Sequence, residues 1–211
     1  MSKSIAILGL GKYGRSLAEQ LYEMGADVLV VDKNRQVIDD IADSCTSAVC
    51  ANLADEDVVV ALGLKNMDIV VTAMGGNFAA SIMAVAVAKE EGVPVVVAKS
   101  SSNRMASLLK KVGADKVIDP EGEGGERSAR ILLSMAFKDF FKLDDNMYLI
   151  QMSPKKDWIG KSLASLELRQ TMKVNVIAAK KKGEQWHFID PNEPMTEEMR
   201  LLIATDKKRQ I

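Results

Sequence analysis

Three glycines near the start of the chain, in the spacing Gly9-x-Gly11-x-x-Gly14, are the residues best suited to bind a phosphate. They follow the apolar run Ile5–Leu8 and precede a helical pattern. In such a setting the first glycine permits a tight turn, the second lets a phosphate approach the backbone, and the third lets the helix pack closely on the strand. The first N–H groups of the helix favour an anion. The pattern predicts a phosphate-binding turn, and the alternative is a fold of this type that has lost its ligand.

An acidic residue, Asp32, ends the next apolar run, Val28–Val31, roughly 20 residues after the glycines. A carboxylate at this place accepts hydrogen bonds from the hydroxyls of a ribose and repels a 2′-phosphate. A glycine motif alone is weak evidence, but its position between a strand and a helix makes it much more specific. The pattern therefore predicts a nucleotide site that disfavours NADP.

The first 120 residues alternate between apolar runs and helical patterns, and glycines follow several of the helices as stop signals. The predicted strands are Ile5–Leu8, Val28–Val31, Ala48–Cys50, Ile69–Ala73, Val95–Ala98 and Val117–Ile118. The predicted helices lie near residues 13–24, 34–43, 55–62, 78–91 and 103–112. This alternation is typical of an α/β fold with a Rossmann-like, doubly wound parallel sheet. Its ligand would lie at the carboxyl ends of the strands, where the strand order reverses.

The alternation of strands and helices stops after Pro120. There a glycine-rich turn precedes a helical pattern from about Glu126 to Phe141. The end of this predicted helix is unusually apolar. Its apolar residues are Ile131, Met135, Phe137, Phe140 and Phe141. Either the helix packs against its own sheet or it crosses to another subunit, because a large apolar patch on a connecting segment usually has a partner.

The last part of the chain predicts a smaller α+β unit. Its expected elements are strands at Met147–Met152, Val174–Ala179, Gln185–Ile189 and Arg200–Thr205, and a helix at Ser162–Met172. We therefore predict a nucleotide-binding domain over residues 1–125, a crossover helix and hinge over residues 126–145, and a C-terminal domain over residues 146–211.

The composition excludes several classes of protein. Among 211 residues, 28 basic and 29 acidic side chains leave a net charge of −1, which speaks against general nucleic-acid binding. Cys45 and Cys50 have neither metal-binding nor redox spacing. Few cysteines and no signal peptide indicate a cytosolic protein. No apolar run reaches the roughly 18 residues of a membrane helix, so we expect no direct membrane insertion, and a role at a membrane would require a partner.

The sequence contains no recognisable set of catalytic residues. A nicotinamide-dependent dehydrogenase normally needs a proton donor or acceptor beside the hydride acceptor. The single histidine, His187, lies in an expected hairpin strand, and no motif of nucleophilic, zinc or P-loop chemistry is present. The sequence predicts a protein that is not an enzyme. The alternatives are an NAD-dependent oxidoreductase and an NADH redox sensor.

Six short segments follow one another along the chain: Gly-Leu-Gly-Lys-Tyr-Gly, Val-Asp-Lys-Asn, Ala-Asn-Leu-Ala-Asp, Ala-Met-Gly-Gly-Asn, Val-Ala-Lys and Gly-Ala-Asp-Lys-Val-Ile-Asp-Pro-Glu. In this order they resemble the RCK (KTN) regulatory subunits of the Trk/Ktr bacterial potassium uptake systems, and the Ktr-type cytosolic subunit most of all. The tail from about residue 147 to 207 resembles the companion C-terminal RCK (TrkA-C) domain by pattern more than by motif. The resemblance implies homodimers that assemble into an octameric ring. The ring would lie at the inner face of the cell membrane and gate a membrane-embedded potassium channel or transporter.

The resemblance also implies ligands. ATP and ADP, or NAD and NADH in some members, would shift the ring between shapes. In several members cyclic di-AMP binds across a dimer interface of the C-terminal domain. Here only the region 174–189 can be indicated for it, and an ordinary dimer interface is the alternative.

Carried over residue by residue, the resemblance assigns a nucleotide site. The glycine loop supplies Gly9, Gly11, Lys12, Tyr13 and Gly14; Asp32, Lys33 and Asn34 lie at the ribose; Ala51 and Asn52 flank the adenine; Ala73, Gly75 and Asn77 approach the phosphate and ribose side; and Lys99 meets phosphate charge. Many relatives have arginine where Lys12 stands, and lysine keeps the charge but lacks the bidentate fork.

Glu121 matches a glutamate that, in Ktr-type members, helps to bind a divalent cation between two nucleotide sites, with Mg or Ca as the expected metal. Two carboxylates beside two polyphosphates would repel one another unless a hard cation lay between them. A solvated acid in a turn is the alternative for Glu121, and a solvated lysine at a strand end is the alternative for Lys99.

Overall fold

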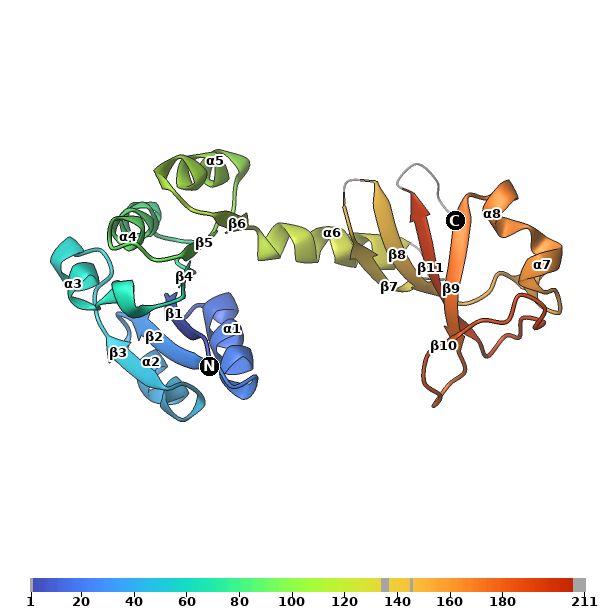
Figure 1. The fold of residues 1–211 in the computed structure, drawn as a ribbon, viewed down its shortest axis with the longest axis horizontal. Coiled ribbons are helices and arrows are strands. Elements are labelled where there is room, and N and C mark those ends of the chain that lie inside the picture. Colours follow the sequence, from blue (N-terminus) through green and yellow to red (C-terminus); the bar gives the residue numbers. More distant parts are fainter. Residues whose placement is uncertain (1, 134–136, 145, 207–211) are drawn as a thin grey trace. The chain divides into compact units, whose positions relative to one another are not determined.

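A computed structural model of the chain describes residues 2–133, 137–144 and 146–206 (Figure 1). The chain divides into two compact units, residues 1–122 and residues 123–211. Helix α6 (Pro120–Leu133) begins in the first unit and continues into the second. Within the described ranges, no helix is both long and apolar enough to span a membrane.

The first unit is built on a parallel sheet of six strands in the order β3-β2-β1-β4-β5-β6. The strands are β1 (Ser4–Leu8), β2 (Asp27–Asp32), β3 (Ser47–Cys50), β4 (Ile69–Thr72), β5 (Val95–Lys99) and β6 (Lys116–Ile118). The helices are α1 (Lys12–Glu23), α2 (Arg35–Ile41), α3 (Glu56–Ala61), α4 (Phe78–Glu90) and α5 (Asn103–Val112), with short 3₁₀ turns at Ala42–Ser44 and Leu64–Asn66. The predicted fold class is confirmed, and the predicted strands and helices of this unit agree with the observed ones to within two residues.

Two apolar clusters, one on each face of the sheet, explain why the strand sequences are apolar at consecutive positions. In β1, Ala6 and Leu8 pack into a cluster with residues of α3, α4 and α5. Ile5 and Ile7 pack into a second cluster with residues of α1 and α2. Because neighbouring side chains of a strand point to opposite faces, each strand must be apolar on both faces when helices cover both. The order of the strands reverses between β1 and β4, which opens a crevice at their carboxyl ends.

The second unit contains an antiparallel sheet in the order β10-β9-β11-β8-β7. Its elements are β7 (Phe137–Lys142), β8 (Met147–Met152), β9 (Val174–Lys180), β10 (His187–Phe188) and β11 (Arg200–Asp206), with short helices at Lys156–Trp158, α7 (Leu163–Leu166) and α8 (Leu168–Thr171). The predicted α+β unit is confirmed, but its single helix is divided. Glu167, with φ of 46°, lies in the left-handed region between α7 and α8 and interrupts the helical path.

The helix predicted from Glu126 to Phe141 is wrong in its second half. Helix α6 ends at Leu133, and the phenylalanines of the predicted helix lie instead on strand β7, which pairs antiparallel with β8. Aromatic residues fit a pleated strand well, and pairing with β8 satisfies the backbone, so tertiary context overrides the local apolar pattern. These phenylalanines therefore do not form the face of a crossover helix. Met135 lies outside the described residues.

Candidate functional site

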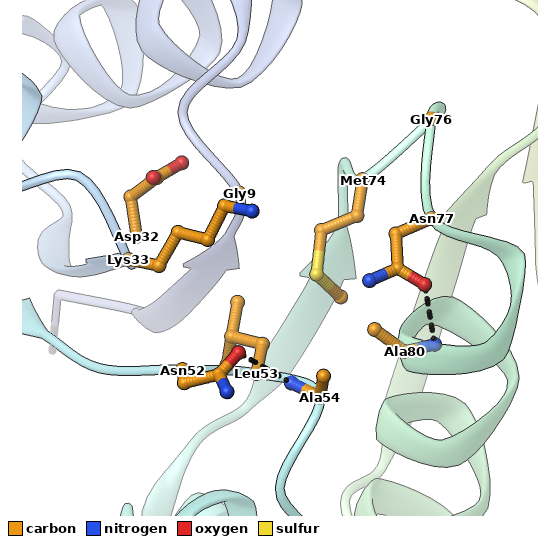
Figure 2. Close-up of a pocket in the computed structure, with 10 residues that line it drawn as sticks. All are labelled: Gly9, Asp32, Lys33, Asn52, Leu53, Ala54, Met74, Gly76, Asn77 and Ala80. Atoms are coloured by element: carbon orange, nitrogen blue, oxygen red, sulfur yellow. Dashed lines mark hydrogen bonds between the residues drawn. The ribbon is translucent and has the colours of Figure 1, made fainter.

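A pocket of about 280 Å³ opens in the first unit, where the turns that follow β1, β2, β3 and β4 meet the first turn of α4 (Figure 2). Its position at the reversal of strand order is where doubly wound sheets bind ligands. The lining residues are Gly9, Asp32, Lys33, Asn52, Leu53, Ala54, Met74, Gly76, Asn77 and Ala80. A few convergent polar groups beside apolar side chains are typical of a site for a small organic ligand.

The glycine loop has the geometry of a tight turn with an open side. Gly9 has φ of 99°, and a Cβ atom there would lie 2.7 Å from Met74 Cγ. A Cβ atom at Gly14 would overlap the carbonyl oxygen of Gly9. At Gly11, the residue before α1, no described atom lies within 4 Å of the position that a Cβ atom would take. Gly9 and Gly14 are thus required by the turn, whereas Gly11 leaves space beside the backbone at the start of α1.

Asp32 joins the ends of two strands at the pocket. One carboxylate oxygen accepts a hydrogen bond from the backbone N–H of Leu10 at 2.7 Å, and the other accepts one from the N–H of Asn34 at 2.9 Å. Each oxygen of a carboxylate can accept a further hydrogen bond. The side chain is therefore held in place by the backbone and still offers acceptors to a ribose.

Two asparagines of the lining are oriented by hydrogen bonds to the backbone. Asn52 Oδ1 accepts from the N–H of Ala54, and Asn77 Oδ1, at the N-cap of α4, accepts from the N–H of Ala80, both at 3.2 Å. In Figure 2 the amide nitrogen of Asn77 points toward Met74, across the pocket. Because the oxygens are engaged, these carboxamides present N–H donors to a ligand.

A second group of predicted residues meets beside the turn between β4 and α4. Lys99, the last residue of β5, forms a hydrogen-bonded ion pair with Glu121 in the first turn of α6. Its Nζ atom lies 3.4 Å from the position that a Cβ atom of Gly75 would take and 5.8 Å from the centroid of the Tyr13 ring. The hydrogen bond from Lys99 lowers the pKa of Glu121 below its usual value of 4.5. Among the described residues, no group of three or more His, Cys, Asp and Glu side chains could hold a metal ion.

The pocket thus contains part of the predicted set. Five predicted residues line it, namely Gly9, Asp32, Lys33, Asn52 and Asn77. The other predicted nucleotide residues lie outside its lining: Gly11, Lys12, Tyr13, Gly14, Asn34, Ala51, Ala73, Gly75 and Lys99. The sequence reasoning missed Leu53, Ala54, Met74, Gly76 and Ala80. Ala54 lies two residues after Asn52, the spacing of an asparagine turn, and Ala80 lies three residues after Asn77, the spacing of a helix N-cap. These local spacings are the sequence signal that could have indicated both alanines.

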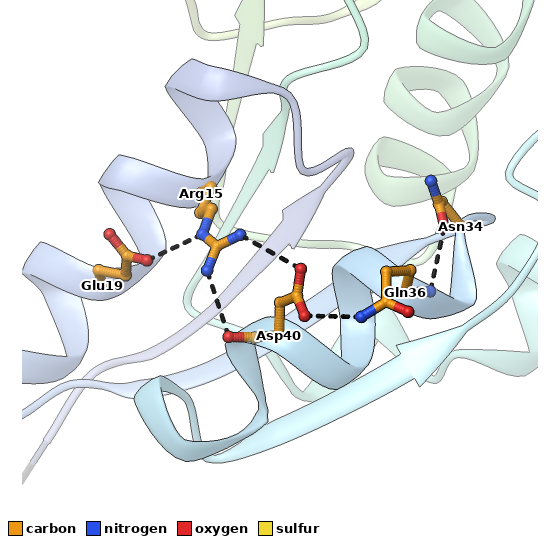
Figure 3. A network of polar contacts seen from close by, with 5 residues as sticks. All are labelled: Arg15, Glu19, Asn34, Gln36 and Asp40. Atoms are coloured by element: carbon orange, nitrogen blue, oxygen red, sulfur yellow. Dashed lines mark hydrogen bonds and ion pairs between the residues drawn. The ribbon is translucent and has the colours of Figure 1, made fainter.

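A polar network connects the two helices that begin beside the pocket (Figure 3). The guanidinium of Arg15 on α1 contacts Glu19 at 3.0 Å and the backbone carbonyl of Asp40 on α2 at 3.2 Å. Gln36 donates to the Asp40 carboxylate at 2.8 Å. The charged side chains are 37 to 45% exposed, so this network contributes little to the stability of the fold.

Comparison with known proteins places this arrangement in a family. Residues 5–120 match the TrkA-N domain. The chain belongs to the TrkA-N family. It is 31% identical over 184 residues to Ktr system potassium uptake protein C of Bacillus subtilis, covering 87% of this chain and 83% of that protein. It is 34% identical over 182 residues to Ktr system potassium uptake protein A of Vibrio alginolyticus, covering 86% of this chain and 83% of that protein. The resemblance to the subunits of potassium uptake systems is confirmed.

Solved structures show the same fold for this TrkA-N protein. The RCK domain of GsuK superposes with a TM-score of 0.65 at 17% identity, covering 98% of this chain and 46% of that one. The GsuK channel bound to NAD gives a TM-score of 0.64 at 16% identity, covering 98% of this chain and 38% of that one. A Kef C-terminal domain from Shewanella denitrificans in its AMP-bound form gives 0.51 at 20% identity, over 62% of this chain and 81% of that one. Structural neighbours of this chain therefore bind nucleotides.

Proposed function

We propose that this TrkA-N protein is a nucleotide-sensing regulatory subunit of a membrane potassium uptake system. The observation that carries the proposal is one pocket formed by the glycine turn, Asp32 and two asparagines. This pocket occurs on a chain that is about 30% identical to Ktr system proteins over most of its length. The subunit would act at the cytoplasmic face of the membrane and gate a potassium channel or transporter through a change of conformation.

We propose ATP and ADP as the ligands, with NAD and NADH as the alternative. The open side of Gly11 provides room for phosphate at the N-terminus of α1, and Asp32 provides acceptors for ribose. A divalent cation at Glu121, cyclic di-AMP near residues 174–189 and an octameric ring of homodimers are further parts of the proposal that rest on the family resemblance alone.

A role without catalysis is also part of the proposal. Among the described residues that line the pocket, the titratable side chains are Asp32 and Lys33, and Asp32 already accepts hydrogen bonds from two backbone N–H groups. An oxidoreductase would need a side chain that exchanges a proton with its substrate, and Lys33 would be the candidate for that role. Turnover of NADH by the purified protein with a carbonyl substrate would favour the oxidoreductase instead.

The first test is calorimetric titration with ATP, ADP, NAD and NADH, each with and without magnesium, on the wild type and on Gly11→Asp. The backbone at Gly11 is extended, with φ of −63°, and its surroundings are open, so we expect the variant to fold. Its carboxylate would occupy the phosphate position, and we expect the affinity to fall at least about tenfold.

Gly11→Ala is the matched control, because it adds a methyl group in the same open space without a charge. We expect a smaller loss of affinity for this variant. Unchanged binding by Gly11→Asp would place the ligand away from the glycine loop.

A further inference from the structure

The ammonium of Lys99 lies between the nucleotide pocket and helix α6. On one side it approaches Gly75, in the turn whose neighbours Met74 and Gly76 line the pocket. On the other side it is paired with Glu121, in the first turn of α6. One cation therefore lies beside the carboxylate of α6 on one side and the turn that borders the pocket on the other.

The burial of the two partners is unequal. The Lys99 side chain is 12% exposed, whereas the Glu121 side chain is 62% exposed. A largely buried ammonium is costly to leave without a counter-charge, while a carboxylate in water loses little when its partner leaves. Lys99 therefore needs an anion at all times, and Glu121 can be replaced as that anion.

The first turns of α6 have little helical stability of their own. They contain Gly122, Gly124 and Gly125, and glycine is a poor helix former. No described atom lies within 4 Å of where Cβ atoms of Gly124 and Gly125 would be, so packing does not require glycine at these two positions. The contacts that hold the first turn include the hydrogen bond from the Gly122 N–H to Asp119, at 3.0 Å, and the pair between Lys99 and Glu121.

We propose that Lys99 is a relay between the pocket and α6. Without ligand it pairs with Glu121 and holds the first turn of the helix. A nucleotide phosphate in the pocket, beside the turn that contains Gly75, competes for the same ammonium and releases Glu121. The inference rests on the proposed function. It adds that ligand binding weakens the first turn of α6, and that a more stable first turn weakens ligand binding. Because α6 continues into the second unit, the released turn lies in the covalent link between the two units.

The test measures ADP affinity by calorimetry without divalent cations. Glu121→Gln removes the competing anion, and we expect it to tighten binding about three- to tenfold. Lys99→Met keeps the apolar length of the side chain and should weaken binding at least about tenfold. In the double variant, Glu121→Gln should have no further effect, because no ammonium remains to be freed. Equal tightening in both backgrounds would mean that Glu121 merely repels the ligand, and would overturn the relay.

Glu123→Gln is the control, because it removes the same charge from the same helix two residues away from Glu121. Its affinity for ADP should stay within twofold of the wild type. If Glu123→Gln tightens binding as much as Glu121→Gln does, the effect is one of general charge and the relay is wrong.

Hydrogen exchange at the amides of residues 122–125 is the second measurement. We expect faster exchange in Glu121→Gln without ligand, and faster exchange in the wild type when ADP is added. Slower or unchanged exchange in both cases would overturn the relay. Absence of nucleotide binding by the wild type would overturn the proposed function and the relay together. Tight binding that Glu121→Gln leaves unchanged would overturn the relay alone.

Discussion

At the scale of single residues, the pocket owes its polarity to side chains whose orientation is fixed by the backbone. Asp32 is held by two N–H groups and presents acceptors, while Asn52 and Asn77 accept backbone N–H groups with their oxygens and present donors. A ribose with its phosphates offers both hydroxyl donors and oxygen acceptors. The arrangement therefore matches the chemistry of a nucleotide better than that of an apolar ligand.

Asn77→Asp separates the two roles of Asn77. Aspartate is a good N-cap and its charge suits the start of α4, so the stability of the fold should not fall. The amide donor, however, becomes a carboxylate that faces an anionic ligand, and we expect the affinity for ADP to drop at least about tenfold. Calorimetry and thermal unfolding together check this expectation.

Asn77→Ser is the control for that substitution, because serine keeps the cap without adding a charge. Its loss of affinity should be smaller than that of Asn77→Asp. An Asn77→Asp variant that binds ADP as the wild type does would remove Asn77 from the ligand site.

At the scale of elements, helix α6 combines a capped start with three glycines in its first two turns. It begins with Asp119 as a cap and Pro120 at its first position, which are favourable starts, and then continues with glycines. Other helices of the first unit, such as α4 and α5, are capped in the same way but contain no glycine within their bounds. The start of α6 is thus well specified in position and weak in stability.

Replacing Gly124 and Gly125 by alanine should stabilise α6. Alanine is favoured over glycine by about 1 kcal/mol in a helix interior, and no described neighbour obstructs a Cβ atom at either position. We expect slower hydrogen exchange in the first turns of the helix. If the order of α6 opposes ligand binding, the double variant should also bind ADP more weakly.

Gly122→Ala is the contrasting variant in the same helix. A Cβ atom there would overlap the carboxylate of Asp119, which caps this residue. The gain in helix propensity should be offset by the loss of the cap. Equal stabilisation by all three alanine variants would show that the cap contributes nothing.

At the scale of the whole molecule, the proposed function predicts a response that depends on a partner. The protein should change the potassium flux of vesicles that contain the cognate membrane subunit, and ATP and ADP should change that flux to different extents. Gly11→Asp should remove the difference between the two nucleotides while the protein still associates with the membrane subunit. Flux that is the same with and without the protein, at every nucleotide tested, would contradict the role in transport.

The sequence by itself determined the elements of the first unit and the turn that carries its chemistry. Strand and helix periodicity, glycine stops and the spacing of Gly9, Gly11 and Gly14 act within short windows of the chain, so they can be interpreted locally. Only the tertiary structure decided where α6 ends and where β7 begins, because the pairing of β7 with β8 competes with helix formation over the same residues. The same holds for Met74 beside Gly9 and for Lys99 beside Glu121, since the packing of a site joins residues that are distant in the sequence.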